Sequence, residues 1–348
     1  DFITYGMVIV AFAIIQILSV TGNISYMISG LLVPVCAYII LAISLNITVG
    51  ILGELSLGQA GFMCIGAYSS SLFSICTQET IQSVWIRFPL AILVGGIFAA
   101  IFGVLIGIPV LRLKGDYLAI VTLAFGEIIK NIFSSTYLGY DNSGLHFSLK
   151  SQSDLGLAAD GKVLINGPLG LNGTPNDSTF VAGFVLIMIT LIITLNFINS
   201  RTGRAVMAIR DNRIAAESIG INITKYKLIA FSLSAFLAGF GGALFSHNFA
   251  TLQAMKFDYN TSILILVFVV LGGIGNIRGS IIAATILYIL PEVLREISDY
   301  RMLFYAILLI VMMIFSSNPT IKGYRERFST STKSAFGKVF PKKKEVEE

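Results

Sequence analysis

Few residues of this chain combine a reactive side chain with a neighbour that would activate it. Glu127 and Lys130 stand three residues apart in the apolar stretch YLAIVTLAFGEIIKNIF, so on a helix they share a face and can form an ion pair. A carboxylate inside an apolar segment is costly in lipid and is typical of a solute pathway or an ion-coupling site. Both readings, a structural pair and a functional group, stay open from the sequence.

The other reactive side chains do not form catalytic or metal-binding patterns. His146 and His247 each lie without a second ligand in their neighbourhood, and no HExxH pattern occurs. Cys36, Cys64 and Cys76 lie in or near apolar segments and are interpreted as small buried hydrophobes. With no serine elbow and no Walker A loop, we expect no catalysis, no metal, no cofactor and no ATP site in this chain.

Composition assigns the chain to the membrane. Of its 348 residues 55% are hydrophobic and 12% are charged, whereas soluble domains carry about 25% charged residues. A helix needs about 20 mostly apolar residues to cross a bilayer. The sequence therefore predicts an all-α polytopic membrane protein with about ten transmembrane helices, some short, broken or re-entrant. The expected spans lie near residues 2–20, 31–52, 58–76, 89–111, 117–136, 180–198, 228–247, 261–275, 279–291 and 303–316.

The glycines of LGGIGNIRG, from Gly272 to Gly279, divide one long hydrophobic block into two pieces. Their spacing does not match a dinucleotide-binding fingerprint, which also needs a strand before it and a helix after it. We expect broken or re-entrant helices at this point. A cytoplasmic turn and a gate are both possible roles.

Basic residues predict the topology, because those near spans are retained on the cytoplasmic side. They concentrate in residues 200–227 and in the polar tail 318–348, whereas the loop 137–179 has few. We therefore expect a permease domain over 1–317 with both termini in the cytoplasm and the loop outside, as a compact cap or a short re-entrant element. The net charge of +5 then reflects topology and lipid headgroups rather than nucleic acid. The chain opens at Asp1, which leaves open whether residues precede it.

Residues 204–220 have apolar side chains at helical spacing among charged ones, which predicts an amphipathic helix that stops at Gly220. Such a helix could rest on lipid headgroups. Physical chemistry alone favours this interpretation, and a helix that docks a cytoplasmic partner is the alternative.

The segment LSLGQAGF is the second candidate for a solute path. Ser56 and Gln59 offer hydrogen-bonding groups, while Gly58 and Gly61 let a helix bend or break beside a pathway. Together with Glu127 these four residues are the predicted translocation path. Pure helix packing is the competing interpretation for the glycines.

Four segments resemble, in order, characteristic parts of the permeases of branched-chain amino-acid ABC transporters, the LivM type. They are GILGELSLGQAGFMCIGAY at 50–68, LRLKGDYLAIVTLAFGEIIKNI at 111–132, GRAVMAIRDNRIAAESIGINITKYKLIAFSLSAFLAGFGGAL, and VVLGGIGNIRGSIIAA at 269–284. The resemblance implies a subunit of the bacterial cell membrane that works beside a second homologous permease. It also implies two cytoplasmic ATPase subunits, which use the ATP, and an external solute-binding protein, for which the stretch 167–175 is a candidate contact.

The same resemblance implies a coupling helix that sits in a groove of the ATPase. Small residues would allow close approach there, and charged residues would contact the rim of the groove. The residues expected to couple are Arg204, Arg210, Ala215, Ala216, Glu217 and Gly220.

The sequence leaves three alternative functions open. Closely related permeases carry urea or short amides, and the sequence does not separate these solutes from leucine, isoleucine or valine. An autonomous transporter driven by an ion gradient would use Glu127 as its coupling site, although no obvious internal repeat supports it. A membrane scaffold without transport would leave the polar, glycine-broken spans unexplained.

Overall fold

The computed structural model describes residues 2–21, 26–113, 115–141, 144–156 and 161–294, and the single positions 303, 306, 307, 309 and 310. The chain divides into two compact units, Asp1–Ile289 and Leu290–Glu348. All contacts and sites discussed below lie within the first unit. The expected tail 318–348, and the expected span 303–316 apart from these single positions, lie outside the described residues.

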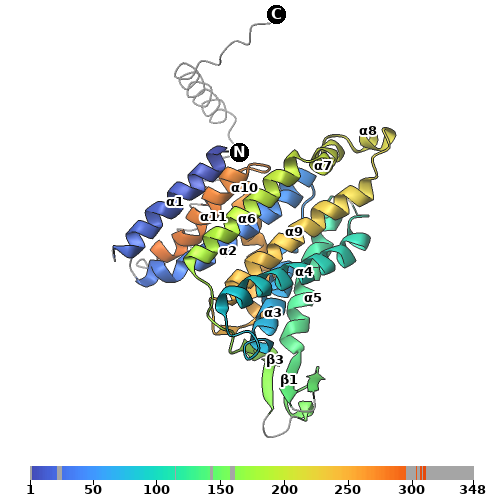
Figure 1. Cartoon of the computed structure of the whole chain (residues 1–348). Coiled ribbons are helices and arrows are strands. Elements are labelled where there is room, and N and C mark those ends of the chain that lie inside the picture. The colour runs from blue at the N-terminus through green and yellow to red at the C-terminus, as the bar shows by residue number, and fades with distance from the viewer. Residues whose placement is uncertain are drawn as a thin grey trace, which may run out of the picture. The chain divides into compact units, whose positions relative to one another are not determined.

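Helices make up most of the first unit (Figure 1). They are α1 (Phe2–Val20), α2 (Tyr26–Asn46), which continues as the π-helix η1 (Ile47–Leu52), α3 (Gln59–Cys76), α4 (Val84–Val110), α5 (Asp116–Ser135), α6 (Phe180–Asn199), α7 (Arg201–Asp211), α8 (Arg213–Ser218), α9 (Ile223–Ser246), α10 (Tyr259–Gly272) and α11 (Ile277–Val293). Short 3-10 turns are η2 (Ser153–Leu155), η3 (Gly167–Leu169) and η4 (Ala254–Phe257).

Each expected span from 2–20 to 279–291 corresponds to a described helix. The number of ten spans is nevertheless not confirmed, because five described stretches are long and apolar enough to cross a membrane. They are Ile28–Leu52, Val84–Val110, Asp116–Ser135, Phe180–Asn199 and Ile223–Ser246.

A small sheet corrects the all-α expectation. Its five strands are β1 (Tyr137–Asp141), β2 (Gly144–Ser148), β3 (Lys162–Asn166), β4 (Leu171–Asn172) and β5 (Thr251–Leu252), in the antiparallel order β2-β1-β3-β4-β5. Short apolar and aromatic runs bounded by glycines favour strands here, and β5 is contributed by the chain after α9. Of the two forms considered for loop 137–179, the described part has the compact one.

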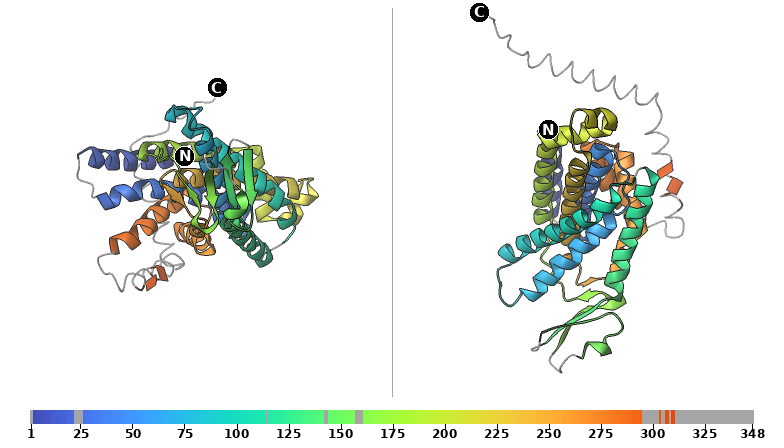
Figure 2. Two further views of the ribbon diagram at one scale, coloured as in Figure 1. Left: turned by 90° about the horizontal axis from the view of Figure 1, so that it is seen from below. Right: turned by 90° about the vertical axis from the view of Figure 1, so that its right-hand side faces the viewer.

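The sheet and the helix pair α7–α8 lie at opposite ends of the helix bundle (Figures 1 and 2). This arrangement follows from the chain path, since α5 leads into β1 and α6 leads from the sheet region back to α7. The two long polar connections are therefore on opposite sides of the apolar layer, as their difference in basic residues predicts.

In the core of the bundle the backbones of three helices, α3, α4 and α9, are in close contact. Helix α9 lies in the centre and packs against α2, α3 and α4. A Cβ atom added to Gly66 of α3 would lie 2.4 Å from the Cα of Gly239 in α9, and one added to Gly239 would lie 2.7 Å from the carbonyl oxygen of Gly95 in α4. Only glycine permits this approach, which brings three helices together over one short stretch.

A buried polar cluster joins the sheet region to the bundle. Arg87 of α4 donates a hydrogen bond of 2.7 Å to Asp177, which precedes α6, and both side chains are almost fully buried. His247, which follows the last residue of α9, is buried beside them, and its Nδ1–H donates to the Ala243 carbonyl at 2.9 Å. Burial lowers the pKa of His247 below its ordinary value of 6.5, with Arg87 acting in the same direction and Asp177 against it.

The glycine contact yields a first prediction. Gly66→Ala should destabilise the protein by about 3 kcal/mol, because its Cβ overlaps backbone atoms that have no room to move. Gly30→Ala in α2 is the matched control, since nothing lies within 4 Å of an added Cβ there. Thermal unfolding in detergent compares the two; equal melting temperatures would contradict the contact.

His247 yields a prediction on pH. A histidine whose folded-state pKa is lowered stays neutral in the fold, so the unfolded chain binds the proton first and stability falls as pH drops below about 6.5. His247→Asn keeps a donor for Ala243 but does not titrate. Between about pH 8 and about pH 5, the wild-type melting temperature should therefore fall further than that of the variant. Parallel curves of melting temperature against pH would show that the buried imidazole does not contribute to the pH dependence of stability.

Candidate functional site: the α7–α8 elbow and the π-helix at Gly50

Helices α7 and α8 form an elbow at one end of the bundle (Figure 1). The sequence predicts one helix over residues 204–220, and the structure corrects this to two. Asn212 has an extended backbone, with φ −153° and ψ 105°, and its side chain accepts a hydrogen bond from the Ala215 N–H at 3.1 Å. An asparagine that caps the next helix breaks the previous one, because its side chain competes with the backbone. Gly220, with φ 84°, follows the end of α8.

The elbow has a buried face and an exposed apolar face. Ile209, Ala216 and Ile223 form a small core that holds α7, α8 and the start of α9 together. Ile214 and Ile219 point away from it and are 81% and 75% exposed. We call Ile214 and Ile219 the elbow patch. Both large apolar side chains are thus exposed on one short polar segment.

The expected coupling residues divide between these two faces. Ala216 is buried in the elbow's own core, whereas Ala215, Glu217 and Gly220 are exposed. Arg204 is exposed and donates to the Asn199 carbonyl at 3.1 Å. Of the two alanines, only Ala215 is therefore accessible on the surface of this chain.

Arg210 connects the elbow to the π-helix η1. Its Nη1 donates to the carbonyl oxygen of Gly50 at 2.9 Å, and its Nη2 pairs with Asp211 at 3.0 Å. The carbon stem of Arg210 lies against Gly53, where an added Cβ would be 2.5 Å from Cγ. Gly50 belongs to η1, and π-helical turns in α-helices are frequent at functional sites because they leave backbone groups free for other partners.

The turn between α10 and α11 packs against the same glycine. The Gly275 N–H donates to Asn46 Oδ1 at 2.9 Å, and Asn46 Nδ2 donates to Ser280 Oγ at 2.8 Å. A Cβ added to Gly50 would lie 2.0 Å from Asn46 Oδ1 and 2.5 Å from Gly275 N. The stretch Gly272–Gly279 is thus a turn at the elbow end of the bundle. Asn46 and Gly50 are not among the predicted site residues, although the carboxamide of Asn46 inside an apolar run is a sequence signal for them.

The expected path residues begin six positions after Gly50. Ser56 is buried, and its hydroxyl has no hydrogen-bond partner among the described residues. Gln59, the first residue of α3, is buried and donates through Nε2 to the Ser44 hydroxyl of α2. These polar groups are inside the bundle, close along the chain to the segment that Arg210 contacts.

Gly58 and Gly61 lie where α3 meets α5. A Cβ added to Gly58 would be 2.7 Å from the Thr122 carbonyl oxygen, and one added to Gly61 would be 2.9 Å from the Cα of Gly126. Both positions therefore serve close helix packing. Whether they also border a solute path stays a prediction.

Both oxygens of Glu127 are engaged. Oε2 accepts from the Lys130 ammonium, the pair that the spacing predicts, and Oε1 accepts from the Tyr259 N–H at 2.9 Å. Tyr259 is the first residue of α10, so the carboxylate stabilises the positive end of that helix. This geometry favours a structural role over an ion-coupling role.

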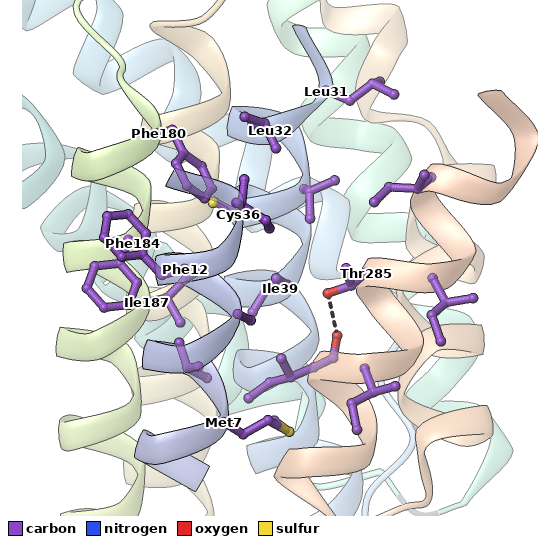
Figure 3. A pocket seen from close by; sticks show the side chains of 18 of the residues that line it. Met7, Phe12, Leu31, Leu32, Cys36, Ile39, Phe180, Phe184, Ile187 and Thr285 are labelled. Carbon is purple, nitrogen blue, oxygen red and sulfur yellow. Dashed lines mark hydrogen bonds between the residues drawn. The ribbon is translucent and has the colours of Figure 1, made fainter. Parts of the chain in front are cut away.

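A cavity of 230 Å³ lies between α1, α2, α6 and α11 (Figure 3). Its walls are almost wholly apolar, with Phe12 stacked on Phe180 and Phe184. Its one hydroxyl, on Thr285, donates to the Ile281 carbonyl at 2.8 Å. The cavity thus offers no free polar group to orient a charged solute, and it suits apolar neighbours in the membrane.

Long apolar helices with a polar elbow at one end define a multi-pass membrane protein. Comparison with known families specifies its class. The family described as branched-chain amino acid transport system, permease component, matches residues 27–316. The chain therefore belongs to this family.

Two relatives match most of this chain. The high-affinity branched-chain amino acid transport system permease protein LivM of Salmonella typhimurium is 35% identical over 293 residues, which cover 80% of this chain and 66% of that protein. LivM of Escherichia coli has the same identity and coverage. This chain thus spans just under two thirds of the length of these relatives.

A more distant relative is named for another solute. The nucleoside ABC transporter permease protein NupC of Lactococcus lactis is 24% identical over 225 residues, 60% of this chain and 62% of that protein. No solved structure matches the chain.

The contacts of Glu127 lead to a prediction on stability and on the ion dependence of uptake. Glu127→Gln should lower stability by about 1 kcal/mol, because the group that accepts from the Tyr259 N–H at the start of α10 loses its negative charge. It should leave the pH and ion dependence of uptake unchanged. Uptake into vesicles over a range of pH and sodium concentration checks this. Loss of an ion dependence in the variant would restore Glu127 as a coupling site.

Proposed function

We propose that this chain is the transmembrane permease subunit of an ABC importer for branched-chain amino acids. It works beside a second homologous permease, two cytoplasmic ATPase subunits and an external solute-binding protein, in a bacterial cell membrane. Family membership and the two LivM relatives support the solute class. The alternatives of urea, short amides or an ion-driven transporter gain no comparable support.

The elbow is the observation that carries the proposal. It presents the elbow patch, Ile214 and Ile219, beside the exposed Glu217 and Ala215. An apolar anchor with a charged rim fits a groove on a soluble partner, because the apolar side chains supply affinity and the charges supply orientation. The dense basic residues of 200–227 favour the cytoplasm for this end.

Arg210 gives the elbow a route into the bundle. When the ATPase pair closes on ATP, it moves α8, and the small core around Ala216 moves α7 with it. Arg210 transfers that movement to Gly50, six residues before Ser56. ATP binding at the partner thereby biases the bundle between inward-open and outward-open states.

The sheet lies at the other end of the bundle and serves the external side in this proposal (Figure 2). The stretch 167–175, which holds η3 and β4, is attached to β5 and so to the end of α9. A solute-binding protein that docks there would contact a surface joined by the Arg87–Asp177 pair to α4.

A prediction on docking follows from the elbow patch. Ile214→Glu and Ile219→Glu should each weaken binding of the ATPase subunits by about tenfold or more, because a charge replaces an apolar side chain that the ATPase would cover in the complex. Leu169→Glu is the matched control, because Leu169 is also an exposed apolar residue but lies at the sheet end. Co-purification from membranes measures binding. Retention of the ATPase by both isoleucine variants would contradict the docking surface.

The substrate is tested separately in proteoliposomes that hold the whole transporter and the binding protein. ATP-dependent uptake of labelled leucine is the expected result. ATP-dependent uptake of urea without leucine would move the chain to the amide branch of the family, and uptake that follows an ion gradient without ATP would refute the ABC mechanism.

A further inference from the structure

A cluster of charged and polar side chains lies where α5 meets the start of α10. Glu127 of α5 accepts a hydrogen bond from the Lys130 ammonium through Oε2 and one from the Tyr259 N–H through Oε1. Asp258 caps α10, and its Oδ2 accepts from Asn260 Nδ2 at 2.7 Å. We call these five residues the midplane cluster.

The midplane cluster lies near half the depth of the bundle. Helix α5 has 20 residues, so it is about 30 Å long and matches the thickness of the hydrocarbon layer. Glu127 is about 17 Å from its start. Helix α10 has 14 residues, about 21 Å, which is too short to cross the layer. Because α10 ends with Gly272 at the elbow end, its start at Tyr259 lies inside the layer.

The cluster is exposed on the outer surface of this chain. The side chains of Glu127 and Lys130 are 26% and 18% exposed, Tyr259 is 48% exposed, and Asn260 is exposed as well. Ionised groups at this depth are too costly to face lipid and are typical of aqueous pathways. The face of α5 and α10 that carries the cluster therefore borders water, with the second permease as the opposite wall in the proposed function.

Apolar side chains lie next to the cluster on both helices. Ile128 follows Glu127 on α5, and Ile263 lies one helical turn after Tyr259 on α10. They are 56% and 41% exposed. The face thus combines ionised groups with an apolar border. A branched-chain amino acid has the same combination, with two charges at one end and an apolar side chain at the other, whereas urea has neither.

The helices that carry the cluster also hold the start of α3. The Leu57 N–H donates to Thr122 Oγ1 of α5 at 3.0 Å, and the Ala60 N–H donates to Ser262 Oγ of α10 at 3.0 Å. Gln59, one of the expected path residues, lies between these two bonds in the chain. The cluster and the predicted path are therefore joined through α5 and α10.

The charges of the cluster favour a solute that carries an ammonium group. Glu127 and Asp258 bring two carboxylates, and Lys130 brings one ammonium. The ammonium of Lys256, two residues before Asp258, lies instead over the ring of Phe249, 4.2 Å from its centroid. The cluster thus has one more negative than positive charge, and an ammonium group from the solute would balance it.

We infer that the midplane cluster binds the charged end of a zwitterionic α-amino acid on its way through the membrane. The inference rests on the proposed function. Lys130 donates to the solute carboxylate through an N–H that Glu127 does not use, while Asp258 and the Asn260 carbonyl accept from the solute ammonium. Glu127 is a positioning residue, because it holds both the Lys130 ammonium and the Tyr259 N–H.

Thiol labelling in the reconstituted transporter tests whether the face is aqueous and binds solute. With the exposed Cys76 replaced by serine, Ile263→Cys should react with a cationic, membrane-impermeant methanethiosulfonate, whereas the buried Cys36 and Cys64 should not. Leucine at about ten times its dissociation constant should slow the reaction about tenfold, because bound solute covers the thiol. Ile97→Cys on α4, which is 42% exposed, is the matched control and should not react.

Two results of this labelling would overturn the inference. Absence of reaction at Ile263→Cys would show that lipid or another chain covers the face. A reaction that leucine does not slow would show an aqueous surface without a solute site. Recognition of both charges is tested with 4-methylpentanoate, which lacks the ammonium group, and with urea. Neither should protect the thiol, and protection by either one as strong as by leucine would refute a zwitterion site.

Variants of the cluster test the roles of its side chains. Lys130→Gln should raise the leucine concentration that gives half protection about tenfold or more, because a charge-assisted hydrogen bond is lost. Lys130→Arg should restore most of the protection. Asn260→Ala, which leaves the Asp258 cap on α10 in place, should raise the concentration about fivefold.

A merely structural cluster would give a different result. It would change the amount of folded transporter but not the concentration of leucine for half protection. An unchanged value in Lys130→Gln would therefore refute the inference. If that variant does not insert into the membrane, Asn260→Ala decides the question in the same way.

Failure of the proposed function is distinguishable from these outcomes. If the transporter shows no ATP-dependent leucine uptake, the substrate or the partner assignment is wrong. Protection of Ile263→Cys by leucine is measured without ATP and without the binding protein, so it still decides whether the midplane cluster binds a zwitterion.

Discussion

The carbonyl oxygen of Gly50 and the space beside it organise the elbow end of the molecule. Arg210 binds that oxygen at 2.9 Å, and the absent side chain leaves room for the Asn46 carboxamide and the Gly275 N–H. Three separate parts of the chain, the elbow, α2 with η1, and the α10–α11 turn, therefore meet at one residue. Any larger residue than glycine would separate all three, since its Cβ would overlap backbone and side-chain atoms alike.

The packing of the bundle differs between its centre and its elbow end. Gly66, Gly95 and Gly239 bring α3, α4 and α9 together with no space between backbones. The segment 53–58, between η1 and α3, is instead held by polar contacts: Glu54 pairs with the Lys227 ammonium, and the Leu57 N–H donates to Thr122 Oγ1 at 3.0 Å. In the proposed function, the elbow acts on this segment through Arg210 and Gly50.

The sequence predicts the helices well because long apolar runs have few alternatives in a membrane. It predicts the Glu127–Lys130 pair because spacing alone brings them together. It does not predict that Asn212 breaks the elbow, that Ala216 turns inward, or that segment 137–179 forms a sheet with β5. The break at Asn212 is local, but an asparagine inside an amphipathic pattern does not by itself show that it caps a new helix. The other two depend on contacts outside the local pattern: the strand after α9 completes the sheet, and Ile209 and Ile223 bury Ala216.

The proposed coupling between the elbow and the bundle is tested most directly by removing the contact between Arg210 and Gly50 in the reconstituted transporter. Arg210→Met removes the hydrogen bond but keeps the carbon stem beside Gly53, and Arg201→Met on the same helix is the control. We expect that the Arg210→Met variant still binds the ATPase subunits, which continue to hydrolyse ATP, while leucine uptake per ATP falls about tenfold. An unchanged ratio of uptake to ATP hydrolysis would show that the elbow acts on the bundle by another route.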